Sequence, residues 1–258
     1  VPEQVADTIV SAIRGWLSEA GFSEIVLGLS GGVDSAVVAA LCARAAGAQH
    51  VTPYLLPYRA SSPESAADAK SVAECLGFKT MTVDLSPMAE PYFTLRHPDP
   101  VRKGNVLARL RMIVLFDAAK ERGALVAGTG NKTETQMGYC TWYGDSACSF
   151  LAIADLYKSQ VWQLAEHLNL PKQVILKAPT ADLWPGQTDE GELGLAYTEM
   201  DLILQGLVDL GLSPEQVIAR GHDRERVRKV YDTMNRTAFK RRLPPVARVS
   251  PAGTTAGA

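Results

Sequence analysis

The chain has 258 residues, of which 47 % are hydrophobic, and this size suits one α/β core or one domain with a small appendage. Its 26 Lys and Arg nearly balance its 28 Asp and Glu, so the net charge of −2 favours neither nucleic acid nor a membrane surface as a partner. The longest apolar segments have about ten residues, whereas a bilayer span needs about 20, and no basic region precedes a signal-peptide core. These features predict a cytoplasmic protein.

Apolar runs of strand length alternate with helical patterns through the first half of the chain. This alternation predicts a doubly wound α/β fold, in which a mainly parallel sheet has helices on both faces. The amphipathic opening segment is expected to pack across that sheet. The expected strands are residues 24–30, 50–58, 78–85 and 124–129, and the expected helices are residues 3–21, 35–47, 62–77 and 104–123.

Two regions lack a clear period, residues 86–103 and residues 178–194. Long loops of this kind are often lids or binding segments, and disorder is the alternative. From Tyr197 onward the pattern is helical, which adds a C-terminal helical segment to the fold. We expect one domain over residues 1–250 and a disordered tail of small residues over 251–258.

The four cysteines do not form a recognisable metal or redox motif. There is no CxxC pair and no histidine nearby at metal-ligand spacing. Free cysteines are commonly buried, so we interpret these four as structural thiols. They are Cys42, Cys75, Cys140 and Cys148.

The segment "SGGVDS", residues 30–35, interrupts the first strand and leads directly into a helix. Backbone N–H groups at such a turn bind phosphate, and Gly31 and Gly32 let the chain approach an anion without a Cβ. Ser30 and Ser35 add hydroxyl donors. The carboxylate of Asp34 beside phosphates suggests a magnesium ion between them. The alternative is an ordinary Gly-rich turn in which Asp34 only starts the helix.

This segment is not a Walker A loop, because it lacks the GxxxxGK[ST] pattern. It resembles the PP-loop of the ATP pyrophosphatases, which hold the pyrophosphate part of ATP and transfer AMP to an acceptor oxygen. The resemblance implies an adenine nucleotide alpha-hydrolase-like fold. The implied ATP-binding residues of the segment are Gly28, Leu29, Ser30, Gly31, Gly32, Val33, Asp34 and Ser35.

Further segments resemble those of the NAD synthetases. They are "KGNVLARLRM" at 103–112, "GTGNKTE" at 128–134, "YGD" at 143–145, "PTADLWPGQTDEGELG" at 179–194 and "KRRLPP" at 240–245. With the PP-loop, the resemblance extends from about Ser30 to Pro245. It implies a homodimer in which the carboxylate of nicotinic acid adenine dinucleotide (deamido-NAD) attacks the α-phosphate of ATP. Ammonia then displaces AMP to form the amide of NAD.

The resemblance gives roles at the ATP end of the site to individual residues. Thr129 follows the fourth strand at the sheet edge of the PP-loop and should contact ATP, as should Thr180. Lys158 matches a lysine on the ATP phosphates and, with Asp34, is the expected catalytic pair. Glu134 is expected to join Asp34 in binding Mg²⁺. Without the resemblance, Glu134 could simply favour a helix N-terminus, and a lysine at a helix start is more often solvated.

The deamido-NAD contacts implied by the resemblance are Arg109, Asp189, Glu190 and Lys240. Arg111 lies two positions after Arg109, faces elsewhere on the helix and is the weaker candidate. Asp189 and Glu190 belong to a loop expected to order over the substrate, although exposed acidic loop residues are the alternative. Lys240 lies in a basic segment that suits a diphosphate, although a solvated basic tail would have the same composition.

Three positions depart from the pattern of ammonia-dependent NAD synthetases. Trp142, Ser149 and Phe239 stand where Lys, Asp and His are common, and they border the deamido-NAD site in the family. Trp142 and Phe239 resemble the synthetase portions of glutamine-dependent members. Because the PP-loop begins at Ser30, we expect no glutaminase domain in this chain and ammonia as its nitrogen donor. A separate glutaminase subunit that delivers ammonia remains open.

Two other classes of protein compete with this interpretation. Other PP-loop enzymes include GMP synthetase, argininosuccinate synthetase and tRNA-thiolating enzymes, and thiolation usually needs a pair of reactive cysteines. Nucleotide-binding regulators of the universal-stress or electron-transfer-flavoprotein kind share the sheet without the chemistry. Asp34, Glu134 and Lys158 argue against a regulator, because retention of a nucleotide does not require two metal-binding carboxylates.

Overall fold

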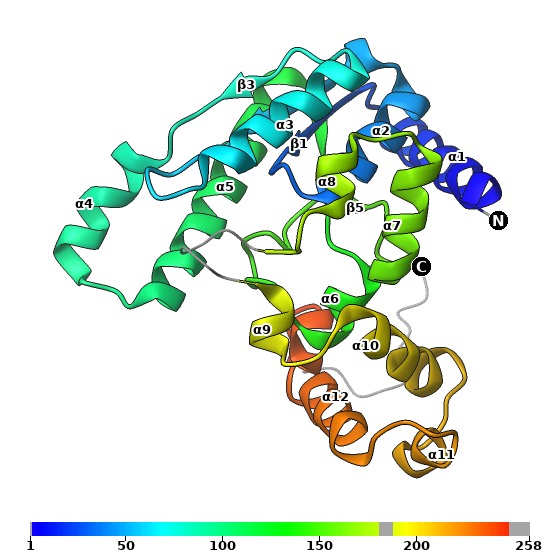
Figure 1. Cartoon of the computed structure of the whole chain (residues 1–258). Coiled ribbons are helices and arrows are strands. Elements are labelled where there is room, and N and C mark those ends of the chain that lie inside the picture. Colours follow the sequence, from blue (N-terminus) through cyan, green and yellow to red (C-terminus); the bar gives the residue numbers. More distant parts are fainter. Residues whose placement is uncertain (1, 181–187, 248–258) are drawn as a thin grey trace, which may run out of the picture.

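The computed structural model describes residues 2–180 and 188–247, and its centre is a five-stranded parallel sheet. The strand order is β3-β2-β1-β4-β5, and every neighbouring pair is parallel, which confirms the predicted fold class. Chain connections run outward from β1 in both directions, so the order reverses between β1 and β4 (Figure 1). The strands are β1 (Glu24–Gly28), β2 (Val51–Leu55), β3 (Met81–Thr82), β4 (Ala124–Gly128) and β5 (Phe150–Leu151).

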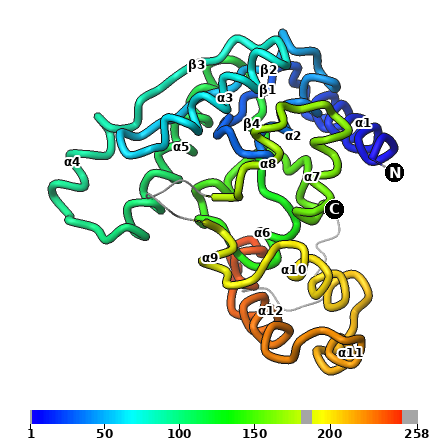
Figure 2. The backbone as a smooth tube through the Cα atoms, in the orientation of Figure 1, coloured from blue at the N-terminus to red at the C-terminus, as the bar shows by residue number. Residues whose placement is uncertain are grey.

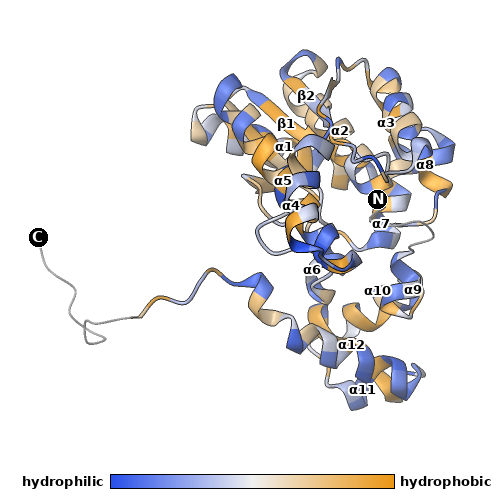
Figure 3. Cartoon of the chain, turned by 90° about the vertical axis from the view of Figure 1, so that its left-hand side faces the viewer, coloured by the Kyte–Doolittle hydropathy of each residue, from blue (hydrophilic) through white to orange (hydrophobic). Residues whose placement is uncertain are grey.

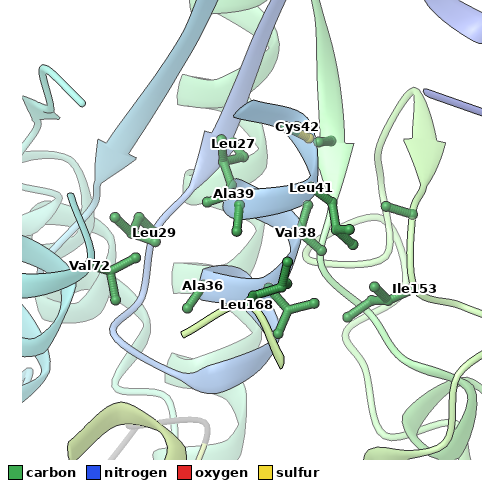
Figure 4. Close-up of a cluster of buried hydrophobic side chains, with 14 of the residues drawn as sticks. Leu27, Leu29, Ala36, Val38, Ala39, Leu41, Cys42, Val72, Ile153 and Leu168 are labelled. Atoms are coloured by element: carbon green, nitrogen blue, oxygen red, sulfur yellow. The ribbon is translucent and has the colours of Figure 1, made fainter. Parts of the chain in front are cut away.

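Helices cover both faces of the sheet because successive side chains of a strand point to opposite faces. Ile25 and Leu27 of β1 pack in a large buried cluster with helix α2, whereas Val26 belongs to the cluster on the other face. Figure 4 shows α2 side chains in the first cluster. The first face carries α1 (Pro2–Ala20), α2 (Val33–Ala46), α3 (Pro63–Leu76), α7 (Lys158–His167) and α8 (Lys172–Leu176), and the second carries α4 (Ser86–Arg96) and α5 (Pro100–Arg122).

The helices at the C-terminal end form a third buried cluster, which includes Tyr197, Met200 and Val227. They lie below the carboxyl edge of the sheet in Figure 1, and the tube in Figure 2 traces the same path. This confirms the predicted C-terminal helical segment. From Tyr197 onward the elements are α10 (Tyr197–Leu204), a π-helical turn (Gln205–Asp209), α11 (Pro214–Ala219), α12 (Arg224–Arg236) and a 3₁₀ turn (Ala238–Arg241). Helix α9 (Asp189–Leu193) precedes them, and α6 (Lys132–Met137), which follows β4, packs against α10 and α12. Another 3₁₀ turn (Ala48–His50) precedes β2.

The prediction of a long loop over residues 86–103 is wrong, because α4 and the start of α5 occupy this region. Proline is tolerated in the first turn of a helix, where its missing N–H would have no partner. Pro100 begins α5, and the side chain of Asp99 caps that helix by accepting from Arg102 N at 2.9 Å. Strand β5 was not predicted.

Figure 3 shows β1 as a hydrophobic strand enclosed by helices with hydrophilic segments on their outer sides. Within the described residues, no helix combines the length and apolar character needed to cross a membrane. The four cysteines are free. Cys42 lies in the core, where burial raises the pKa of its thiol to about 12. Cys75 is exposed, so the prediction of a buried thiol is wrong for this residue. The predicted tail over 251–258 lies outside the described residues.

Candidate functional site

The segment at residues 30–35 forms the turn after β1 and the first three residues of α2, and its own hydroxyl groups hold it in place. Ser30 Oγ lies 3.1 Å from Ser35 Oγ and accepts a hydrogen bond from Gly32 N at 3.2 Å. Ser35 Oγ donates to Gly32 O at 3.0 Å and accepts from Ser30 N at 3.2 Å. These contacts fix the turn at the N-terminus of a 14-residue helix, where partial positive charge favours an anion.

Gly31 allows this turn to lie against α3. Its φ of +83° is in the left-handed region, and a Cβ at this position would lie 2.3 Å from the carbonyl oxygen of Ser65. Any residue with a side chain would therefore clash with backbone as well as adopt an unfavourable conformation. At the neighbouring Gly32, the nearest atom to an added Cβ would be Ser30 Oγ, at 3.4 Å. The close contact with α3 therefore requires glycine at position 31, whereas no such contact requires it at position 32.

Lys158 lies at the N-terminus of α7 with its amino group between two carboxylates. The Lys158 residue is only 2 % exposed. Its Nζ forms an ion pair with Asp34 and lies 3.9 Å from Glu134 Oε1. Asn131 Nδ2 donates to the other carboxylate oxygen of Asp34 at 2.8 Å. The alternative of a solvated helix-start lysine is therefore wrong for Lys158.

Glu134 has two structural roles at once. Its Oε2 accepts from Asn131 N at 3.2 Å, and Asn131 Oδ1 accepts from Glu134 N at 2.9 Å, which makes a capping box at the start of α6. Its Oε1 faces Lys158. Burial, followed by the negative charge of Asp34, raises the pKa of Glu134 to about 8, and Lys158 opposes that shift. A cation between the two carboxylates would stabilise the charged form of Glu134.

Burial alone would lower the pKa of Lys158, but the carboxylates of Asp34 and Glu134 outweigh it and raise that pKa. Lys158 therefore remains a cation inside the site. Its Nζ also lies 5.2 Å from the ring centroid of Tyr197. The hydroxyl of Tyr197 donates to Asp189 Oδ2 at 3.0 Å, which brings a third carboxylate near the amino group.

A second set of buried groups fixes the backbone at Lys158. Thr133 Oγ1 accepts from Lys158 N at 3.0 Å and donates to Asp201 Oδ1 at 2.6 Å. Asp201 Oδ2 accepts from Ser159 N at 2.8 Å. Thr133 and Asp201 thus satisfy N–H groups at the start of α7, which have no partner within their own helix. The position of Lys158 depends on contacts among α6, α7 and α10.

The Ser-Gly-Gly turn, Asp34, Glu134 and Lys158 face a cleft of about 620 Å³ at the carboxyl edge of the sheet, beside the reversal of strand order. This is where open α/β sheets bind their ligands. Gly31, Arg109 and Glu190 are not in its lining. The candidate residues that do line it are Gly28, Leu29, Ser30, Gly32, Val33, Asp34, Ser35, Thr129, Glu134, Lys158, Thr180, Asp189 and Lys240.

The sequence profile of the NAD synthase family matches residues 5–244. The chain belongs to the NAD synthase family. It is 42 % identical over 248 residues to the NH(3)-dependent NAD(+) synthetase of Fusobacterium nucleatum, covering 96 % of each chain. It is 47 % identical over 244 residues to that of Trichlorobacter lovleyi, covering 94 % of this chain and 89 % of the relative. The NMN synthetase structure from Francisella tularensis is similar with a TM-score of 0.85 and 32 % identity, covering 96 % and 98 % of the two chains.

The four residues of this chain that the family resemblance assigned to deamido-NAD lie in different surroundings. Arg109 is exposed and donates to Trp142 O at 3.2 Å, whereas Arg111, the weaker candidate, lines the cleft. Lys240 donates to Gly138 O and Cys140 O at 2.8 and 2.7 Å. Asp189 is buried against two tyrosine hydroxyls. The carboxylate of Glu190 instead accepts from Tyr197 N at 2.8 Å, at the start of α10.

The three residues that differ from the pattern of ammonia-dependent NAD synthetases, Trp142, Ser149 and Phe239, lie in two kinds of environment. Ser149 forms two hydrogen bonds with the backbone of Val126. Its Oγ accepts from Val126 N at 3.0 Å, and its N donates to Val126 O at 2.8 Å. Trp142 and Phe239 meet edge to face, with ring centroids 5.4 Å apart. Ser149 therefore joins the middle of β4 to the residue before β5, whereas the two aromatic side chains contact each other.

Several residues of the cleft region were missed by the sequence analysis. Asn131 is fully buried and bonds to Asp34, and the N-x-x-E spacing of Asn131 and Glu134 is a capping-box signal that could have identified it. Tyr139 and Glu192 line the cleft, and their hydrogen bond of 3.0 Å links the end of α6 to α9. No local pattern marks these last two residues, because they meet only through the fold.

Asp34 and Glu134 could together hold a magnesium ion. Mg²⁺ prefers oxygen ligands and commonly takes one or two carboxylates together with substrate phosphates and water. Within residues 2–180 and 188–247, no group of three or more His, Cys, Asp or Glu side chains is arranged to hold a metal. The two carboxylates converge on one point at the phosphate-type turn, so the donor set fits a metal that binds together with a nucleotide.

Proposed function

We propose that the chain catalyses the ATP-dependent amidation of deamido-NAD to NAD with ammonia, releasing AMP and pyrophosphate. The carrying observation is the buried cation of Lys158, held against Asp34 and Glu134 beside the Ser-Gly-Gly turn. A site for a leaving pyrophosphate needs such a fixed positive charge. Membership of the NAD synthase family, and relatives named NH(3)-dependent NAD(+) synthetases, support both the reaction and the nitrogen donor.

In the first step, a carboxylate oxygen of deamido-NAD attacks the α-phosphorus of ATP, and the bond from that phosphorus to pyrophosphate breaks. The backbone N–H groups of residues 30–35 and the ammonium group of Lys158 hold the negative charge of the leaving pyrophosphate. Gly28, Leu29, Thr129 and Thr180 complete the ATP contacts. We infer that Asp34 and Lys158 are the catalytic pair, since Asp34 orients the Lys158 amino group.

In the second step, ammonia attacks the acyl carbon of the adenylate, loses a proton, and the carbon–oxygen bond to AMP breaks. Asp189 lies in the cleft near Lys158 and is a candidate for guiding the incoming ammonium ion, because its carboxylate is buried among polar groups of the cleft. This step needs no group from a second protein. A separate glutaminase subunit would change only the source of ammonia.

We infer that Mg²⁺ accompanies ATP and is held by Asp34 and Glu134, where it would supply positive charge that neutralises the phosphates. Burial and then the negative charge of Asp34 raise the pKa of Glu134 to about 8, and a metal cation between the two carboxylates would oppose both effects. Lys158 alone balances only one of these two charges.

We infer that deamido-NAD contacts Arg109, Asp189, Glu190 and Lys240. Lys240 has the strongest support, because it lines the cleft and because its two carbonyl partners among the described residues use only two of its three N–H groups. Glu190 has the weakest support, because its carboxylate accepts from the backbone of α10. A single domain over residues 1–250 and a cytoplasmic location remain predictions.

A homodimer is the proposed assembly. It is supported by apolar side chains of α5 that are exposed in the single chain, with Ile113 52 % and Phe116 38 % exposed. Contiguous exposed apolar surface of this kind commonly marks a protein interface. Arg109 lies on the same helix, so an interface along α5 would border the proposed deamido-NAD site.

Amidation of nicotinic acid mononucleotide is the second candidate reaction. It uses the same chemistry on a shorter substrate, and the similarity to the NMN synthetase of Francisella tularensis favours it. We place it second because the relatives more than 40 % identical to this chain are named NAD(+) synthetases.

The test incubates the purified chain with ATP, Mg²⁺ and deamido-NAD, and supplies either ammonium or glutamine. We expect NAD, AMP and pyrophosphate in equal amounts with ammonium and little NAD with glutamine. Equal activity with glutamine, in a preparation free of contaminating glutaminase, would refute the ammonia assignment. Absence of NAD with both donors would refute the proposed reaction.

A further inference from the structure

Lys177, the residue that follows α8, contacts α3 at the wall of the cleft. Its Nζ donates to Ser65 Oγ at 3.1 Å and to Asp68 Oδ2 at 2.7 Å. The contact with Asp68 is an ion pair whose side chains are only 22 % and 16 % exposed. Salt screens an ion pair in such surroundings less than one on an open surface. The segment after α8 is therefore fixed to α3 at this point.

The same turn of α3 also contacts the Ser-Gly-Gly turn. A Cβ at Gly31 would lie 2.3 Å from Ser65 O and 3.1 Å from Asp68 Cβ, so the two segments touch directly. Ser65 and Asp68 are three residues apart and therefore lie on one face of the helix. One turn of α3 thus sets the distance between the Ser-Gly-Gly turn and the segment after α8.

Residues 177–180 form a strip of the cleft wall that is held at both ends. All four of these residues line the cleft, and they lie outside any helix or strand. Lys177 joins the start of the strip to α3, and Pro179 O accepts from Asp189 N at 3.0 Å, at the start of α9. The strip ends at Thr180, which we expect to contact ATP. The position of Thr180 therefore depends on contacts made by the side chain of Lys177 and the backbone of Pro179.

We propose that Lys177 is a positioning residue for ATP, which acts through its ion pair with Asp68 and not by contact with the nucleotide. The inference rests on the proposed function, because it concerns how Thr180 is placed relative to the Ser-Gly-Gly turn. Asp68 supplies a negative charge that balances the Lys177 cation. Asp68 is not in the cleft lining, so it can affect a ligand in the cleft only through Lys177 and α3.

Removal of Asp68 separates positioning from direct contact. Asp68→Ala keeps a good helix former in α3 but leaves Lys177 without its counter-charge. A lysine that contacted ATP directly would then bind ATP as well as before or better. If Lys177 positions the strip, Asp68→Ala should instead weaken ATP binding about tenfold, the size expected when one hydrogen bond to a charged ligand is weakened.

Lys177→Met should have the same effect as Asp68→Ala. The double variant should be no worse than either single variant, because residues that act as a pair give non-additive losses. Lys177→Arg keeps a cation with several donors and should bind ATP nearly as well as the unmodified chain. Gln173→Ala is the matched control. Gln173 Nε2 donates to Ser71 Oγ at 2.8 Å, so it also joins α8 to α3, but neither residue lines the cleft.

Isothermal titration with ATP and Mg²⁺ measures binding, and steady-state assays of amidation give the KM of each substrate. We expect the KM for ATP to rise in Asp68→Ala and Lys177→Met. The KM for deamido-NAD and kcat should stay nearly unchanged, because a contact made equally before and during the reaction affects binding alone. Gln173→Ala should match the unmodified chain in every measurement.

Unchanged or tighter ATP binding by Asp68→Ala would overturn the inference, as would single losses that multiply in the double variant. An equal rise of both KM values, or a Gln173→Ala variant as impaired as Lys177→Met, would indicate general loosening between α8 and α3 and would also overturn it. If the unmodified chain binds ATP but forms no NAD, the proposed function fails and the titrations alone decide on Lys177. A chain that does not bind ATP would overturn both.

Discussion

Lys158 is held by three residues from two parts of the chain, and each has a different effect on it. Asp34 pairs with it, Glu134 lies 3.9 Å away, and Thr133 fixes the backbone N–H of Lys158. A buried lysine without partners would lose its proton, so the carboxylates keep it charged. The charge that the proposed reaction needs is therefore maintained by the same residues that we expect to bind Mg²⁺.

The first prediction concerns these two carboxylates. Asp34→Asn and Glu134→Gln each remove one negative charge with little change in shape. We expect each variant to lower magnesium-dependent pyrophosphate release at least about a hundredfold, a loss typical of removing an electrostatic contact to a reacting phosphate. Circular dichroism should show the same fold, since both amides can still form hydrogen bonds. Full turnover by either variant would exclude that residue from the metal site.

The second prediction concerns the buried hydroxyl of Thr133. Thr133→Val removes the partner of Lys158 N and leaves Asp201 with one contact fewer, so we expect a loss of about 1–3 kcal/mol in the free energy of unfolding. The KM for ATP should rise as well, because α7 begins at Lys158. Urea unfolding and pyrophosphate release measure the two effects. Thr133→Ser keeps the hydroxyl and should restore both, and a Ser variant as impaired as Val would contradict this role.

At the scale of elements, the site is assembled where β1, β4, α6 and α7 begin or end. Helix α3 packs directly against the turn after β1, and Gly31 is the residue of the turn that contacts it. Across this contact, Lys177 after α8 donates to Ser65 Oγ at 3.1 Å and to Asp68 Oδ2 at 2.7 Å. Helix α3 is thereby tied to the segment that follows α8.

The third prediction follows from this packing. Gly31→Ala should lower the free energy of unfolding by about 1–3 kcal/mol and weaken ATP binding, because it adds left-handed strain and a clash with Ser65 O. Chemical denaturation and isothermal titration with ATP measure the two effects. Gly15→Ala in α1 is the matched control, since nothing lies within 4 Å of the place its Cβ would take and helix propensity favours alanine. Unchanged stability of Gly31→Ala would contradict the packing argument.

The sequence predicted the elements whose signals are local. The apolar runs of β1, β2 and β4 and the Ser-Gly-Gly turn each lie within a few residues, and hydrophobic period and turn chemistry are enough to recognise them. Helix α4 was missed because Pro91 lies inside it and obscures its period. Strand β5 has only two residues, too few for any pattern, and exists because it pairs with β4.

The residues of the candidate site also divide into those with a local sequence signal and those without one. Asp34 and Glu134 could be chosen because each belongs to a recognisable motif. The contact between Thr133 and Asp201 joins residues 68 positions apart, and the edge-to-face contact of Trp142 with Phe239 depends on the meeting of two separate segments of the chain. Such groups become visible only when the tertiary structure brings them together.

At the scale of the whole molecule, the sheet and the C-terminal helices have separate hydrophobic clusters, and the cleft is lined by both parts. The sheet supplies the Ser-Gly-Gly turn and Asp34, while the C-terminal part supplies Asp189 and Lys240. Substrates bound in the cleft would therefore contact both parts.

The fourth prediction tests the proposed homodimer. Light scattering at micromolar concentration should give twice the mass of one chain. Ile113→Glu places a charge on the exposed apolar surface of α5 and should shift the chain toward monomer, with loss of amidation. Leu210→Glu, at another exposed apolar position, is the control and should remain dimeric. A fully active monomer of the unmodified chain would contradict the assembly.

The central claim is that the carboxylate of deamido-NAD is adenylylated before ammonia attacks it. The most direct measurement uses deamido-NAD with ¹⁸O at both carboxylate oxygens, together with ATP, Mg²⁺ and ammonium, and determines the position of the label by mass spectrometry. Because the carbon–oxygen bond breaks when ammonia displaces AMP, one ¹⁸O should appear in the phosphate of AMP for each NAD formed. Label in pyrophosphate or inorganic phosphate, with none in AMP, would contradict the account.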